Sequence, residues 1–175
     1  MKQHALVLQD RSKGLQITPT IAILIATCLL PLMVHLIPIG GGAPAGAMLL
    51  PIFYLPFIAL IFFKKHVALV AALLAPFINF LLTGNPQWEL VTLLSVELVA
   101  FVILSAGLLR QHRLKWIAAP VGYLGAKLVS SLVLILLPLL PNLQASDFLA
   151  QSIATALPGI LILMVINILV LKLKK

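Results

Sequence analysis

The stretch LLSVELVAFVIL, from Leu93 to Leu104, holds a single charged side chain, Glu97, among residues that are almost all apolar. It lies inside a longer apolar run over residues 88–109. A helix that crosses the hydrocarbon core of a bilayer needs roughly 20 mainly apolar residues, so this run is long enough to span a membrane. The stretch therefore predicts a transmembrane helix that carries a carboxylate at membrane depth.

Similar apolar runs occupy most of the rest of the chain. Hydrophobic residues make up 62% of the 175 residues and charged residues only 9%, a balance that a soluble domain could not hide from water. The connections between the runs are too short to form an aqueous domain. We therefore predict one domain over residues 1–175, an all-α polytopic integral membrane protein built as a six-helix transmembrane bundle. The predicted helices cover residues 17–39, 47–63, 67–82, 88–109, 116–140 and 150–171.

The positive charges lie in alternate connections. Lys and Arg occur before the first run, between the second and third, between the fourth and fifth, and after the sixth, while the other three connections hold none. By the positive-inside rule, both termini are predicted to be cytoplasmic. Lys127 is the exception, because it falls inside the fifth run. The net charge of +8 thus follows topology and forms no patch for nucleic acid, which we do not expect as a partner.

Several classes of enzyme lack their motifs in this chain. There is no G-x-x-x-x-G-K-[ST] motif for ATP hydrolysis and no H-E-x-x-H motif for a zinc protease. The four histidines are far apart in the sequence, so a metal site is not expected. Only Glu97 and Lys127 are ionisable at membrane depth, which leaves no nucleophile with a base. We therefore predict no enzymatic activity, no cofactor and no metal.

Glu97 and Lys127 are predicted to lie at similar depth. At a rise of about 1.5 Å per residue, Glu97 lies roughly 13 Å below the outer interface at Trp88. Lys127 lies roughly 18 Å from the inner face of a core about 30 Å thick. A charge at the centre of a membrane helix costs about 2.5–3.5 kcal/mol, so the two are expected to pair or to share a ligand. A purely structural ion pair between two helices remains the alternative.

Further polar residues fall in the outer half of the predicted bundle. On the fifth helix, three of them lie about one turn before or after Lys127 and form one stripe with it. Three more lie near the outer ends of other helices. Together with Glu97 and Lys127, the candidate residues for binding a solute are Asn79, Trp88, Tyr123, Ser130, Ser131 and His35.

The first predicted helix carries a feature of a different kind. Ala22 and Ala26 form a small-x-x-x-small pair on one face of this helix. Such a pair lets a second helix approach closely in a membrane. We therefore expect Ala22 and Ala26 to form a partner interface.

Taken together, these features resemble the substrate-binding S component of an energy-coupling factor (ECF) vitamin transporter. The likeness covers most of the chain. It rests on the six helices with both ends inside, the Ala22 and Ala26 pair, and the glycine-rich connection GGGAPAGA from Gly40. It also rests on LLAPFINFLLTGNP, from Leu73 to Pro86, which is similar to the proline-containing third helix and T-G-x-P turn of several S components.

The resemblance implies a function. An S component in the prokaryotic cytoplasmic (inner) membrane binds a vitamin or a small vitamin-like precursor from outside. Its helix-one alanines contact the transmembrane T component, which is coupled to two ATPase subunits. Asn85 stands where many relatives have methionine, and the Met-His-Ile start of the metal-specific branch is absent, which disfavours cobalt or nickel as substrate. The basic and the acidic group would suit a small polar or zwitterionic solute that also has an apolar or aromatic body, for which Trp88 and Tyr54 are candidate stacking partners.

Two other classes of protein stay open at this point. A small membrane scaffold or morphogenesis protein would use its helices only to organise partners, with Glu97 and Lys127 as a structural pair. A stand-alone secondary carrier or proton-coupled exporter would use Glu97 as its proton site, but such carriers usually contain internal repeats, and no convincing repeat relates the two halves of this chain.

Overall fold

A computed structural model describes residues 17–35, 44–84, 87–137 and 144–174. Within these ranges every element is a helix, which confirms the all-α prediction. Residues 36–39 and 138–140, where the sequence places two helix ends, lie outside the described residues. The elements are α2 (Ile17–His35), α3 (Ala45–Leu49), α4 (Pro51–Phe62), α5 (Lys65–Thr83), α6 (Trp88–Leu109), η1 (Leu114–Ile117), α7 (Ala118–Leu136), α8 (Ala145–Thr155) and α9 (Leu157–Leu173).

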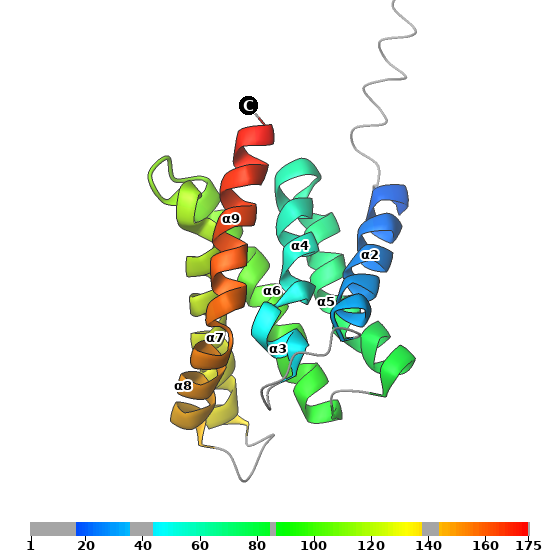
Figure 1. Ribbon diagram of the computed structural model, residues 1–175, viewed down its shortest axis with the longest axis vertical. Coiled ribbons are helices and arrows are strands. Elements are labelled where there is room, and N and C mark those ends of the chain that lie inside the picture. The colour runs from blue at the N-terminus through cyan, green and yellow to red at the C-terminus, as the bar shows by residue number, and fades with distance from the viewer. Residues whose placement is uncertain (1–16, 36–43, 85–86, 138–143, 175) are drawn as a thin grey trace, which may run out of the picture.

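Several of these helices are long and apolar enough to cross a membrane. Five segments meet this condition in the described residues, and a sixth does so if α8 and α9 form one bent span. The long helices run roughly along one direction and form a bundle (Figure 1). The structure thus agrees with a multi-pass membrane protein of five or six spans.

Two predicted helices are broken in the structure. Over residues 47–63 the sequence predicts one helix, but α3 ends at Leu50, which has the left-handed angles φ 55° and ψ 38°, and α4 then begins at Pro51. Over residues 150–171, α8 ends before Ala156, and α9 follows at an angle of 61° with Pro158 in its first turn. Proline is tolerated in a first helical turn because its missing N–H needs no partner there.

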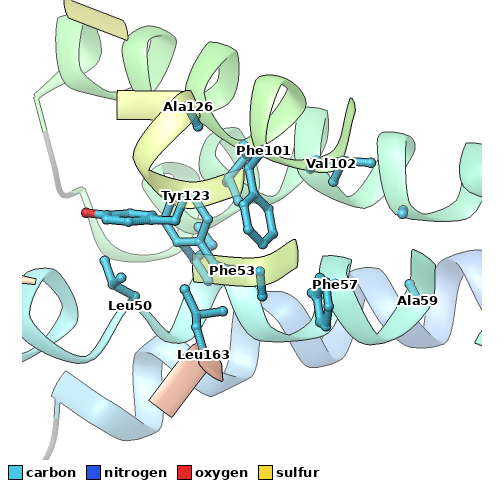
Figure 2. Packing of buried hydrophobic residues seen from close by; sticks show 14 of the residues in the cluster. Leu50, Phe53, Phe57, Ala59, Phe101, Val102, Tyr123, Ala126 and Leu163 are labelled. Carbon is cyan, nitrogen blue, oxygen red and sulfur yellow. The ribbon is translucent and has the colours of Figure 1, made fainter. Parts of the chain in front are cut away.

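The helices surround α4. Helix α2 contacts α4 and α5, α5 contacts α6, α6 contacts α7, and α7 contacts α9, which returns to α4. The aromatic core lies between α4, α6 and α7, where Phe53 packs edge-to-face on Phe101 and on Tyr123 at centroid distances of 5.1 and 5.2 Å (Figure 2). Such pairs stabilise a core beyond the area they bury. This core holds α6 and α7 at fixed positions beside α4.

Small residues bring α6 and α7 close together. Ala118, Gly122 and Ala126 are buried at one-turn intervals along α7. A Cβ atom at Gly122 would lie only 2.2 Å from Ser105 Oγ of α6, so no larger residue fits there without movement. Ser105 Oγ also donates to Ala118 O at 3.3 Å. Close approach of this kind is how small residues pair helices in membranes.

The two ends of the bundle differ in charge. Helix α2 begins and α9 ends at the same end of the bundle (Figure 1). Among the described residues, every Lys and Arg except Lys127 lies at that end, in or beside the α4–α5 and α6–α7 connections or near the end of α9. The described acidic residues Glu89 and Asp147 lie in the first turns of α6 and α8, at the opposite end.

Candidate functional site

A buried ion pair joins α6 to α7. Lys127 Nζ lies 2.9 Å from Glu97 Oε2, and the Glu97 residue is 2% exposed. The antiparallel contact of Ser105 with Gly122 explains the register. Glu97 precedes Ser105 by about two turns, and α7 runs the other way, so the stretch of α7 two turns after Gly122 faces Glu97. That stretch contains Lys127 and Ser130.

The ion pair leaves one carboxylate oxygen unused. Glu97 Oε1 is buried and accepts no hydrogen bond from the described residues. Ser130 lies beside the carboxylate, but its hydroxyl donates to Lys127 O at 3.0 Å. A hydroxyl carries only one hydrogen, so it cannot serve both acceptors at once. An unpaired buried acceptor costs free energy unless a water or a ligand donates to it.

A cavity of about 860 Å³ lies beside this pair. Its walls come from α2, the α3–α4 break, the last turns of α5, the first half of α6, and from α7 and α8. Small-molecule sites in proteins usually measure about 300–1,000 Å³ and combine apolar walls with a few polar groups. This cavity fits that description, because Leu50, Phe53 and Leu93 line it together with Glu97 and Lys127.

Other predicted residues reach the same cavity. Asn79, near the end of α5, is 7% exposed, and its Oδ1 atom is buried without a partner among the described residues. Tyr123 lines the cavity from α7, and its hydroxyl points away from the Phe53 and Phe101 rings (Figure 2). The structure therefore brings Glu97, Lys127, Asn79 and Tyr123 together from three helices.

Two aromatic rings flank the ammonium group. Lys127 Nζ lies 5.6 Å from the ring centroid of Tyr123 and 5.0 Å from that of Phe148. Both distances are within the range of cation–π attraction, which helps to hold a cation in a poorly solvated place. Phe148 comes from α8, so the broken sixth span contributes directly to the surroundings of Lys127.

The remaining predicted residues lie outside the cavity lining, donate hydrogen bonds to backbone carbonyls, or lie outside the described structure. Trp88 is 55% exposed and packs on Phe77 and Phe80, outside the cavity lining. Ser131 is buried and donates to Lys127 O at 2.9 Å, so it faces the helix backbone. The side chain of His35 lies outside the described part of the structure. Tyr54 donates its hydroxyl to Leu49 O and does not line the cavity.

Sequence reasoning did not find the part of the site on α8. Gln151, Ser152 and Thr155 line the cavity together with Phe148. Residues 145–149 fall in a predicted outer connection, although Phe148 and Leu149 stand among polar residues in the segment ASDFLAQSIAT. An amphipathic pattern of this kind predicts a helix with one buried face. This pattern was the feature of the sequence from which the contribution of α8 to the site could have been predicted.

A second buried polar residue lies at the other end of the bundle. Asn167 of α9 is fully buried, and its Oδ1 accepts the Ala119 N–H at 3.1 Å. Its Nδ2 donates to Lys115 O at 3.0 Å and to Trp116 O at 2.7 Å. Asn167 thus ties α9 to the start of α7, and both of its polar atoms have protein partners.

No family model, curated protein or solved structure matches this chain. The function must therefore be argued from the cavity itself. Within the described residues it offers buried hydrogen-bond acceptors at Glu97 and Asn79, an ammonium group at Lys127, and apolar walls. These groups can bind and orient a small molecule.

Proposed function

We propose that this protein is the substrate-binding membrane subunit of an ECF-type ABC importer. In this proposal it captures a vitamin or a small vitamin-like precursor from outside the cell, in a prokaryotic cytoplasmic membrane. A transmembrane T component and two ATPase subunits then drive uptake. The observation that carries the proposal is the cavity of about 860 Å³ lined by Glu97, whose Oε1 atom has no partner among the described residues.

The position of the cavity supports capture from outside. Its lining includes the break between α3 and α4, the last turns of α5 and the start of α6. These segments lie away from the end that carries the described Lys and Arg side chains of the connections. By the positive-inside rule, the cationic end is the cytoplasmic end, with both termini on that side. The cavity would then lie in the outer half of the membrane.

The face of α2 supports the proposed partner. Ala22 is exposed, Ala26 is half-buried, and their neighbours Ile21 and Ile25 are more than half exposed. Small residues on an exposed helical face allow another transmembrane helix to approach closely. In the proposal, this face binds the T component.

The first experiment tests capture. The full chain, purified in detergent without added solute, is examined by native mass spectrometry for a bound small molecule. The proposal expects a bound organic molecule in the wild type and its loss in the double variant Glu97→Gln with Lys127→Met. A wild-type protein that carries no small molecule and binds none from a vitamin panel would contradict the proposal and favour a structural scaffold.

A second experiment tests the energy source and separates the importer from a stand-alone carrier. Uptake into cells that express the chain alone is compared with uptake into cells that also express an ECF T component with its two ATPases. The proposal expects uptake only with the full set of subunits, and Ala22→Leu is expected to reduce it. Uptake by the chain alone, driven by a proton gradient, would instead identify a secondary carrier.

Orientation is tested separately. Single cysteines at Pro44, Gln87 or Gln144, in a Cys28→Ala background, should react with an impermeant maleimide in intact cells. A cysteine at His112, in the α6–α7 connection, is the matched control and should react only after the cells are permeabilised. The opposite pattern would place the cavity on the cytoplasmic side.

A further inference from the structure

The bound solute must satisfy particular atoms. Glu97 Oε1 and Asn79 Oδ1 are both buried, both belong to residues of the cavity wall, and both lack donors among the described residues. Neither oxygen can form a hydrogen bond with another acceptor, so each requires an N–H or O–H group from beyond the described residues. A solute, or water in its absence, can supply donors at this point.

The same place also offers donors. Lys127 Nζ donates to Glu97 Oε2, which in the described part of the chain is its one hydrogen bond. An ammonium group has three N–H donors, so further donors remain for a solute acceptor. Because Lys127 and Glu97 are in contact, the free acceptor Oε1 and the free N–H groups of Nζ are neighbours. A solute edge with a donor next to an acceptor would satisfy both.

The charges limit the solute further. Glu97 and Lys127 neutralise each other, and the other polar residues of the cavity wall, such as Asn79 and Gln151, are uncharged. An anion held by the free N–H groups of Lys127 would bring a second negative charge to a buried site that has only one counter-charge, a costly state. A cation held by Glu97 Oε1 would likewise add a second positive charge beside Lys127. A neutral solute meets neither penalty.

We infer that the site binds a neutral nitrogen heterocycle with an amide-type edge, in which an N–H group stands next to a carbonyl oxygen or ring nitrogen. The N–H donates to Glu97 Oε1, and the neighbouring acceptor receives a hydrogen bond from Lys127 Nζ. Asn79 Oδ1 accepts a second donor of the solute. The apolar body packs against Phe53, Leu93 and Phe148, which line the same cavity. This inference rests on the proposed capture of a solute and specifies its chemistry.

Three related probes test this inference by isothermal titration calorimetry on the full chain in detergent. Quinolin-2(1H)-one has the amide-type edge, its N-methyl derivative lacks the N–H, and quinoline-2-carboxylate is an anion of similar shape. We expect the lactam to bind, and the other two to bind at least about tenfold more weakly, since each loses a hydrogen bond to a charged group or adds an uncompensated charge to the buried site.

Two variants of α6 make the test specific. In Glu97→Gln, the amide oxygen is expected to face Lys127 and the NH₂ group to face the cavity, so the lactam and its N-methyl derivative should bind within about twofold of each other. Glu89→Gln is the matched control, because Glu89 is exposed near the start of the same helix and does not line the cavity. It should keep the wild-type preference.

The outcomes separate this inference from the proposed function. If the N-methyl derivative binds as tightly as the lactam, or the carboxylate binds best, the inference is overturned while solute capture stands. If no probe binds, a molecule that co-purifies with the protein decides: a neutral molecule with an amide-type edge supports the inference, and an anion or a molecule without N–H groups overturns it. If nothing binds or co-purifies, the proposed function and the inference fail together.

Discussion

Two asparagines at opposite ends of the bundle show two uses of a buried polar group. Asn167 lies near the cationic end, and its side chain makes hydrogen bonds to three backbone groups in η1 and at the start of α7. Asn79 lies beside the cavity, and its Oδ1 has no partner among the described residues. Both are buried, but within the described residues only Asn167 has partners for both of its polar atoms.

The difference teaches how to separate structure from function among buried polar residues. A satisfied group contributes to stability, and its removal leaves its partners without a hydrogen bond. An unsatisfied group costs stability, so a water, an ion or a ligand that supplies its missing partner would offset that cost. Glu97 combines both cases in one carboxylate, because Oε2 binds Lys127 and Oε1 has no partner in the described part of the chain. The following predictions test this distinction.

The largest effect is expected from Lys127→Met. This change leaves Glu97 buried without its counter-charge, which should cost about 3–5 kcal/mol of unfolding free energy. Adding Glu97→Gln should recover most of that loss, but not solute binding. The measurement is reversible unfolding in detergent, with Lys172→Met as a control, since Lys172 is exposed at the end of α9. A double variant that binds solute like the wild type would show that the pair is purely structural.

The next effect is expected from Asn167→Leu. It leaves the buried Ala119 N–H without a partner and removes the donor to Lys115 O and Trp116 O. At about 1–3 kcal/mol for a buried group left unpaired, we expect a loss of roughly 2–3 kcal/mol of stability. The solute affinity of the folded protein should stay unchanged, as determined by calorimetry below the unfolding transition. If Asn167→Leu is as stable as the wild type, the hydrogen bonds of Asn167 do not stabilise the fold, and its contrast with Asn79 fails.

Asn79→Leu should behave in the opposite way. It removes an acceptor that has no partner in the described structure, so stability should change by less than about 0.5 kcal/mol or should rise. Solute affinity should fall by about tenfold, the value of one lost hydrogen bond. Unfolding and calorimetry on the same preparation give both values. A large loss of stability with unchanged affinity would assign Asn79 to the structural class.

The smallest effect on the isolated protein is expected from Ala22→Leu. Ala22 is exposed on α2 within the described structure, so the added side chain does not enter the described core, and stability and solute affinity should stay within about 0.5 kcal/mol of the wild type. Ala150→Leu, at an exposed alanine of α8, is the matched control. Only Ala22→Leu should weaken co-purification with a T component. If both variants co-purify equally well with the T component, α2 does not form the partner interface.

The sequence predicted much of the fold because membrane helices follow from local properties. The run over residues 88–109 has the same bounds in α6, since length and hydrophobicity decide a membrane helix. The breaks at Leu50 and Ala156 were harder to predict. Proline at the start of α4 and of α9 permits a break, but Pro56 and Pro76 lie inside helices that continue. Whether a proline ends a helix depends on the neighbours that satisfy the freed backbone groups.

The site was partly predictable for the same reason. A lone glutamate and a lone lysine in apolar helices at similar depth predict an ion pair, because an unpaired charge costs free energy at membrane depth. The structure places their charged atoms 2.9 Å apart. Trp88 was predicted at the site because it lies near the outer end of its predicted helix. In the structure it packs on Phe77 and Phe80, outside the cavity lining. Depth along a helix is readable from sequence, but the direction a side chain faces is set by the helices around it.

By itself, the sequence determined that this chain is made of apolar helices, that its cations lie in alternate connections, and that Glu97 and Lys127 need each other or a ligand. Those conclusions depend on transfer free energies that each residue carries wherever it stands. Only the tertiary structure decided that α8 brings Phe148 to Lys127, and that Glu97 Oε1 and Asn79 Oδ1, beside one cavity, have no partners among the described residues. Those facts depend on packing between distant segments, such as the close contact of Gly122 with Ser105, which no local pattern encodes.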